Sequence, residues 1–166
     1  MLEIMATRRD VVLAAVLAAW LGLPGMQAQA ADDAKVKTAM QTLKDATAKL
    51  GPARLDGEVL YFGTTKINDN FTVVDDVKAK HGGTATLFIK KGNNFVRVST
   101  NVMKDGGRAV GTILDPSGPA YAANNQGNAF YGMVDILGKI FDTGYEPIKS
   151  DGGAVIGIYY VGYAME

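Results

Sequence analysis

Arg97 is the residue with the clearest potential for ligand chemistry in this sequence. It interrupts a strand-like run, residues 95–102, between two valines, so neighbouring strands would remove water from its guanidinium. A buried guanidinium without a partner is costly, and its planar fork can hold a carboxylate through two parallel hydrogen bonds. Two interpretations remain open: an ion pair with Asp135 or Asp142, or a site for a ligand carboxylate.

A second group of candidates lies in the run of residues 129–163, which predicts three antiparallel strands joined by turns at Gly138 and at residues 150–153. If residues 136–138 form a three-residue loop, odd positions of the first two strands share one face. That face would carry Tyr131, Met133, Asp135, Phe141, Thr143 and Tyr145, and the other face Phe130, Val134, Ile136, Ile140 and Ile148. The mixed polar and aromatic face is suited to a ligand.

Catalytic chemistry finds little support. The chain has no cysteine, and its one histidine, His81, has no second histidine to complete a metal site. No G-x-S-x-G, H-E-x-x-H or phosphate loop occurs, and the carboxylate pairs Asp75/Asp76 and Asp135/Asp142 have no evident substrate cleft. Seventeen basic and seventeen acidic residues cancel, which gives no reason to expect a nucleic-acid partner. We expect no enzymatic activity and no cofactor.

The N-terminus predicts export. Two arginines precede an apolar run at residues 11–23, and Ala28-Gln29-Ala30 matches a cleavage signature, an order typical of a secretory signal peptide. We therefore expect residues 1–30 to be removed and residues 31–166 to form one periplasmic or secreted domain. An uncleaved membrane anchor is the alternative, and the arginines do not distinguish the general from the twin-arginine route.

The spacing of apolar residues predicts most elements of the mature domain. Residues 32–50 carry a helical stripe of Val36, Met40, Leu43, Thr47 and Leu50, which would lie across a sheet or form a coiled-coil seam. Further expected elements are a strand at residues 58–62, a helix at 72–80 capped by Thr72 with an exposed His81 at its end, and a hairpin of residues 84–90 and 95–102 around a turn at 92–94.

The long segment of residues 103–128 is rich in glycine and predicts little strand. Asp115 and Pro116 could cap and begin a short helix that runs through Tyr121. A connection of this length in a compact domain is usually functional or disordered, and its apolar residues indicate that it packs against the sheet. We expect a lid over the polar and aromatic face.

Several runs of this sequence resemble the PAS-like Cache sensor domains of bacterial chemoreceptors and sensor kinases: VLYFG at 59–63, GTAT at 83–86, FVRVSTNV at 95–102, GT at 111–112, TGYEPI at 143–148 and IGIYYVG at 156–162. The resemblance covers most of residues 31–166. It implies an α+β fold, with an antiparallel sheet of about five strands, an N-terminal helix on one face and a ligand lid on the other. It also implies that a small organic acid binds between sheet and lid.

The resemblance suggests site residues as well. In related citrate and dicarboxylate sensors an arginine on this strand and residues on the penultimate strand hold the carboxylates, which match Arg97 and Thr100, then Thr143 and Tyr145. The last two positions are basic in the citrate sensors and neutral here, which favours a monocarboxylate or a neutral solute. The complete candidate site is Arg97, Thr100, Tyr121, Tyr131, Thr143, Tyr145 and Tyr159.

The sequence also sets expectations about partners. It stops directly after its last predicted strand, without the second membrane helix and effector of a receptor. We therefore expect a sensor or solute-binding module whose output goes through a membrane sensor kinase or chemoreceptor, with a weak homodimer through the N-terminal helix as a further option. The alternative is a membrane-anchored sensory or structural module with no small-molecule ligand.

Overall fold

The computed structural model describes the backbone of residues 24–165 and the side chains of residues 34–165. The elements in chain order are α1 (Pro24–Ala48), β1 (Ala53–Asp56), β2 (Val59–Phe62), β3 (Thr65–Lys66), α2 (Thr72–His81), β4 (Thr84–Lys91), β5 (Asn94–Thr100), β6 (Met103–Lys104), β7 (Gly107–Arg108), α3 (Pro119–Asn125), β8 (Phe130–Ile136), β9 (Lys139–Lys149) and β10 (Val155–Ala164).

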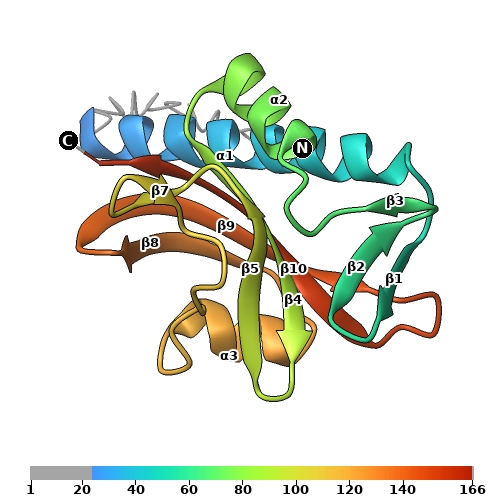
Figure 1. The fold of residues 1–166 in the computed structure, drawn as a ribbon. Helices are drawn as coiled ribbons and strands as arrows, with labels where there is room; N and C mark the ends of the chain where they lie inside the picture. Colours follow the sequence, from blue (N-terminus) through green and yellow to red (C-terminus); the bar gives the residue numbers. More distant parts are fainter. Residues whose placement is uncertain (1–23, 166) are drawn as a thin grey trace, which may run out of the picture.

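A five-stranded antiparallel sheet of order β5-β4-β10-β9-β8 forms the centre of the fold, as the sequence predicted. Figure 1 shows α1 running across one face of this sheet, with α2 beside it. The loop after β7 and the short helix α3 lie on the other face, where α3 contacts β8, β9 and β10. A small sheet of β1, β2 and β3 extends one end of the molecule.

The predicted helical stripe is confirmed as core. Val36, Met40, Leu43 and Thr47 are buried, because α1 lays them on β9 and β10, while Leu50 at the end of the stripe is half-buried. The coiled-coil alternative fails, since these side chains already pack inside the domain. The helix begins at Pro24, earlier than residue 32, and it includes the predicted cleavage signature; most of the predicted signal peptide lies outside the described residues.

Two apolar clusters sandwich the sheet. The cluster on the α1 face joins Met40 and Leu43 to odd residues of β4, such as Leu87, and to Val161 of β10. The cluster on the opposite face joins even residues of β4 and β10 to the loop and α3, for example through Phe88 and Leu114. Side chains alternate between the two faces along each strand. We call the second face, the one under residues 102–125, the lid face.

The register of β8 and β9 corrects one prediction. The turn between them contains two residues, Leu137 and Gly138, with φ angles of 55° and 84°, and Ile136 pairs with Lys139. Left-handed conformations at both central positions suit the twist of a two-residue hairpin. The predicted three-residue loop is therefore wrong by one residue, and even positions of β8 share a face with odd positions of β9.

Three local details of the helix ends also differ from the predictions. Helix α2 begins at Thr72, but no side chain caps it, and Asn70 Oδ1 accepts a bond of 3.2 Å from the backbone N–H of Thr72 instead. His81 at its end is half-buried, with Nε2 and Thr42 Oγ1 2.8 Å apart. The expected exposed histidine is therefore wrong, because α1 packs against this end of α2.

The short helix of the lid segment begins later than the sequence suggested. Helix α3 starts at Pro119, and Gly118 occupies its N-cap position. Asp115 does not cap it, because its Oδ1 accepts bonds from the backbone N–H and the hydroxyl of Ser117 in a local turn, at 2.9 and 2.7 Å. The proline at the first helical position is thus Pro119, since its missing N–H would have no partner there.

Candidate functional site

Arg97 lies on β5 with its side chain on the lid face, since it pairs with Phe88 of β4. Only 4% of its surface is exposed. Nη1 donates to Thr112 Oγ1 at 2.8 Å and to the Ile113 carbonyl at 3.5 Å, and the guanidinium carbon sits 4.9 Å from the centre of the Phe88 ring. Burial lowers the pKa of Arg97, but a guanidinium remains charged at neutral pH.

The charge of Arg97 is not neutralised by an ion pair within residues 34–165, whose four ion pairs involve other residues. Asp142 in particular pairs along the sheet with Met133, whose register places it on the α1 face. The ion-pair interpretation is therefore not supported. In addition, the buried Nε of Arg97 has no hydrogen-bond partner among the described residues.

Tyr145 is a second residue on this face with a buried polar atom that lacks a hydrogen-bond partner among the described residues. It is 0% exposed, its ring lies 4.9 Å from that of Tyr160, and its hydroxyl has no hydrogen-bond partner in the described part of the chain. Burial raises the pKa of Tyr145 far above its usual value, while the charge of Arg97 acts to lower it, so the phenol stays protonated. The neighbouring Tyr160 hydroxyl is satisfied, at 2.9 Å from Thr84 Oγ1.

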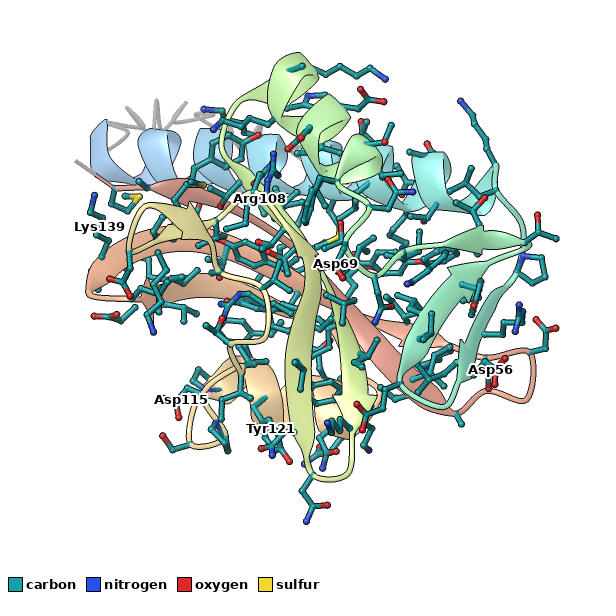
Figure 2. The ribbon with its side chains drawn as sticks, in the orientation of Figure 1. Asp56, Asp69, Arg108, Asp115, Tyr121 and Lys139 are labelled. Carbon is teal, nitrogen blue, oxygen red and sulfur yellow. The ribbon has the colours of Figure 1, made fainter. Side chains whose placement is uncertain are left out.

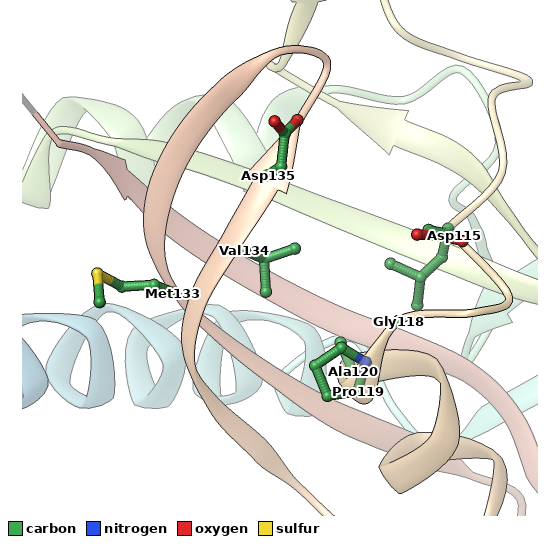
Figure 3. Close-up of a pocket in the computed structure, with 8 residues that line it drawn as sticks. Asp115, Gly118, Pro119, Ala120, Met133, Val134 and Asp135 are labelled. Carbon is green, nitrogen blue, oxygen red and sulfur yellow. The ribbon is translucent and has the colours of Figure 1, made fainter.

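Arg97 and Tyr145 line the same cavity, which has a volume of about 160 Å³. Its walls are apolar at Ile113, Leu114, Val134 and Ile136, and Asp115 and Asp135 also line it. A second cavity of about 200 Å³ adjoins it through Leu114, Asp115, Val134 and Asp135 and extends to the start of α3. In Figure 3 the side chain of Val134 points toward the loop that carries Asp115, and Met133 points away from it.

The segment over the site is held against the outer edge of β5. The backbone N–H of Arg97 donates to the carbonyl of Thr112, Gly111 donates to the carbonyl of Arg97, and Leu114 donates to that of Phe95, at 2.8 to 2.9 Å. A bridge also pairs Val96 with Ile113. The predicted lid thus behaves as a partial extra strand beside β5.

The base of this segment is fixed by a second arginine. Arg108 donates from Nη1 and Nη2 to the two oxygens of Asp75 on α2, at 2.8 and 2.9 Å, and its guanidinium carbon lies 4.3 Å from the centre of the Phe71 ring. The hydrogen bond that Arg108 donates to Asp75 raises the pKa of Arg108. A bidentate pair of this kind fixes orientation. It therefore secures residues 107–108 at one end of the site (Figure 2).

Three of the predicted site residues share the lid face with Arg97 but have other partners. Thr100 Oγ1 lies 2.6 Å from Thr86 Oγ1, and Thr143 Oγ1 donates to the Gly132 carbonyl at 2.6 Å. Tyr121 of α3 donates to the Asn93 carbonyl at 2.6 Å. None of the three lines the cavity with Arg97, so they shape the face without reaching into that space.

The two remaining predicted residues lie on the opposite face. Tyr131 donates to Glu146 Oε1 at 2.5 Å, and Lys44 of α1 donates to Glu146 Oε2 at 2.6 Å. Tyr159 accepts a bond of 3.4 Å from Thr47, also on α1. The prediction that Tyr131 faces the same side as Tyr145 is wrong, because the two-residue turn shifts the parity of β8.

Several residues that line the cavity with Arg97 were not among the predicted site residues. Val134 and Ile136 were assigned to the opposite face for the same reason that Tyr131 was misplaced. Leu114 and Asp115 come from the lid segment, and Thr112 supplies the acceptor for Arg97. Glycine is common at the second position of two-residue hairpin turns, and Gly138 occupies that position here. A predicted Leu137-Gly138 turn would therefore have placed the β8 residues on the correct faces.

The five-stranded antiparallel sheet with helices on its two faces defines an α+β, PAS-like domain. The Cache 3/Cache 2 fusion domain family matches residues 21–166, and the chain belongs to this family. Cache domains are extracytoplasmic sensors that bind small molecules and associate with kinases or chemoreceptors, and domains of this kind are generally non-enzymatic.

The chain is similar to the GAF domain of nlh2 from A. Aeolicus, crystallised in an inactive state, at 13% identity over 81% of this chain and 83% of that one, with a TM-score of 0.44. A comparison with curated proteins found no match.

Within residues 24–165, no helix is long and apolar enough to cross a bilayer, and no group of acidic and histidine side chains could hold a metal ion.

Proposed function

We propose that this chain is an exported Cache-type sensor or solute-binding domain whose lid-face cavity holds the carboxylate of a small organic acid. The observation that supports it best is that the two residues with unsatisfied buried donors on this face, Arg97 (Nε) and Tyr145 (its hydroxyl), line one cavity. They come from β5 and β9, which two other strands separate in the sheet. Buried polar groups in folded proteins almost always have partners, so two orphans at one cavity indicate a ligand.

A carboxylate matches these groups chemically. It is an acceptor only, with two oxygens, and each orphan is a donor. A charge-assisted bond from the guanidinium would neutralise Arg97, which has no acidic partner within the described chain. The Tyr145 phenol adds a directed bond without a second charge. Arg97 is the only basic residue among those that line this cavity, so a single carboxylate is favoured over a tricarboxylate.

The size of the cavity limits the ligand. The cavity has a volume of about 160 Å³. Most drug-sized ligands occupy roughly 300 Å³ or more, so this cavity alone suits an acid of only a few heavy atoms. A monocarboxylate such as acetate or propionate is therefore the class to test first.

The test uses titration calorimetry and thermal melts of the same proteins with acetate and propionate. Arg97→Lys should weaken binding strongly, because an ammonium cannot reproduce the planar fork, and Arg97→Ala should abolish measurable binding while the domain still folds. Arg54→Lys is the matched control, since Arg54 is exposed on β1 and is absent from the cavity lining. If Arg97→Ala melts far below the parent and its folded fraction binds acids normally, Arg97 is structural and the proposal is wrong.

The finer features of the proposal concern location and output. We propose cleavage after Ala30, which would retain every core residue of α1 from Val36 onward. Intact-mass measurement of the exported protein should give an N-terminus at Ala31; a protein that keeps Trp20 and requires detergent would contradict it. We further propose that output passes through a separate membrane kinase or chemoreceptor, with no enzymatic step and no cofactor in this domain.

A further inference from the structure

Strand β8 ends the central sheet, and its outer edge lacks the cover that the opposite edge has. On the opposite edge, the lid segment forms backbone hydrogen bonds with Phe95 and Arg97 of β5. Among residues 24–165, by contrast, β8 pairs with β9 alone, and none of its backbone groups bonds to the backbone of a loop or turn. An uncovered edge strand is a template for pairing with another strand.

The backbone groups on this open edge belong to the odd residues of β8. In an antiparallel pair, residues that direct their backbone groups at the partner strand alternate with residues that direct them away. Gly132 presents its carbonyl to β9, because Thr143 Oγ1 donates to it at 2.6 Å. Ile140 of β9 directs its carbonyl away from β8, to the N–H of Met165 at 2.9 Å, so its partner Asp135 faces outward. The residues with outward N–H and C=O groups are therefore Tyr131, Met133 and Asp135.

The side chains along this edge give it little protection against pairing. Met133, on the α1 face, has 58% of its surface exposed, and Figure 3 shows it on the side of β8 opposite Val134. Asp135 is the only charged residue of the strand, which contains neither lysine nor proline. Charged side chains and prolines are the usual means by which proteins block an edge strand. The centre of the open edge is thus apolar.

The strand complements itself when a second copy runs antiparallel to it. Met133 is the middle one of seven residues, so a two-fold axis beside it pairs the whole of β8 with its copy. Each Asp135 then lies opposite Tyr131 of the partner subunit, and each Phe130 lies opposite Ile136 of the partner subunit. An axis beside Asp135 would instead place two like charges opposite one another, which is unfavourable.

A basic side chain lies beside the position that the partner's Asp135 would occupy. Lys37 of α1 is exposed, with Nζ 5.6 Å from the centre of the Tyr131 ring. Neither Lys37 nor Asp135 forms an ion pair with another described residue. Since Cβ atoms directly opposite in a sheet are about 5 Å apart, Lys37 could reach the carboxylate that faces Tyr131. The surface is therefore complementary to itself in charge as well as in shape.

We propose that two copies of this chain associate through β8, antiparallel and centred on Met133, so that their sheets join into one. The backbone groups of the open edge provide the hydrogen bonds, and Met133 buries apolar surface at the axis. The pair of Lys37 and the partner's Asp135 selects the register. A contact centred on one strand is smaller than a standard interface, so the dimer is weak and depends on concentration. This inference does not depend on the ligand proposed above.

Disulfide formation tests the position of the axis directly, because the natural chain has no cysteine. Cα atoms of a hydrogen-bonded antiparallel pair are about 5.5 Å apart, within the range of a disulfide. Under mild oxidation, Met133→Cys should therefore give a disulfide-linked dimer on a non-reducing gel. Met103→Cys is the matched control, since Met103 is also 58% exposed but lies on β6, and it should remain largely monomeric. Equal cross-linking of the two variants would indicate random collision and refute the proposal.

Sedimentation velocity at protein concentrations up to about 1 mM, the range of weak complexes, measures the reversible dimer. Asp135→Lys and Lys37→Asp should each weaken association about two- to thirtyfold, the value of the two exposed ion pairs that the axis generates. The double variant should recover the association of the parent, because the exchanged charges attract again. A parent that is monomeric throughout would overturn the proposal. So would a dimer that neither single variant weakens, or a double variant that recovers nothing.

Discussion

Tyr145 and Tyr160 provide a matched test of the orphan hydroxyl at the candidate site. Both side chains are fully buried on the lid face, are paired across β9 and β10, and have rings 4.9 Å apart. They differ in one respect: the Tyr160 hydroxyl bonds to Thr84 Oγ1, while the Tyr145 hydroxyl has no partner among the described residues. Replacement of either by Phe removes one oxygen and keeps the ring contacts.

The expected changes in unfolding free energy have opposite signs. A buried polar group without a partner costs about 1–3 kcal/mol, so Tyr145→Phe should stabilise the domain, by about 1 kcal/mol at the lower end of that range. Tyr160→Phe should cost about 0.5–1.5 kcal/mol, the net worth of one hydrogen bond. Thr84 keeps its bond of 3.1 Å to the Gly162 carbonyl, so no second orphan arises.

Thermal melts without ligand measure both changes. A gain of about 1 kcal/mol raises Tm by about 2–4 °C in a domain of this size, and the Tyr160→Phe loss lowers it by about 1–6 °C. Calorimetry with propionate should then show affinity about 10- to 150-fold weaker for Tyr145→Phe, the loss of a bond to a charged group of about 1.5–3 kcal/mol. If Tyr145→Phe is destabilised as much as Tyr160→Phe, the hydroxyl is structural and the reasoning is refuted.

Two further predictions concern α1 and its contact with the sheet. Leu43→Ala should lower the unfolding free energy, measured with urea, by about 2–5 kcal/mol, because Leu43 is 0% exposed. Gln41→Ala, on the solvent side of α1, should change the unfolding free energy little, and equal effects of the two substitutions would contradict the packing of α1. Burial acts to raise the pKa of Glu146, but hydrogen bonds from Lys44 and Tyr131 outweigh it and hold the pKa below the usual 4.5. The stabilisation that ionised Glu146 provides is therefore complete above about pH 4.5 and is lost as the pH falls through the lowered pKa. The difference in unfolding free energy between the parent and Glu146→Gln should accordingly narrow below about pH 4.5; a difference that widens would contradict this.

Local patterns in the sequence were sufficient for α1, α2 and the strands of the central sheet in their order, but not for the short strands β1, β3, β6 and β7. The stripe from Val36 to Thr47 repeats at helical spacing, and such a stripe must be buried against something in a domain of this length. The turn residues at 92–93 and 150–153 delimit the strands through their backbone preferences, which act within a few residues. Arg97 could be singled out for the same reason, because a charge between two valines in a strand is anomalous in any register.

The faces on which the site residues lie, and the residues that meet at the cavity, depend on sheet register and on the packing of the lid. One residue of difference in the β8–β9 turn moved Tyr131 to the α1 face and brought Val134 toward the cavity, since side chains alternate with a period of two. The approach of Arg97 and Tyr145, 48 residues apart in the chain, depends on pairing through β4 and β10, which no local pattern encodes. The missing partners of Arg97 Nε and the Tyr145 hydroxyl can be recognised only in the complete structure. Whether a buried donor has a hydrogen-bond partner depends on the positions of all the groups packed around it.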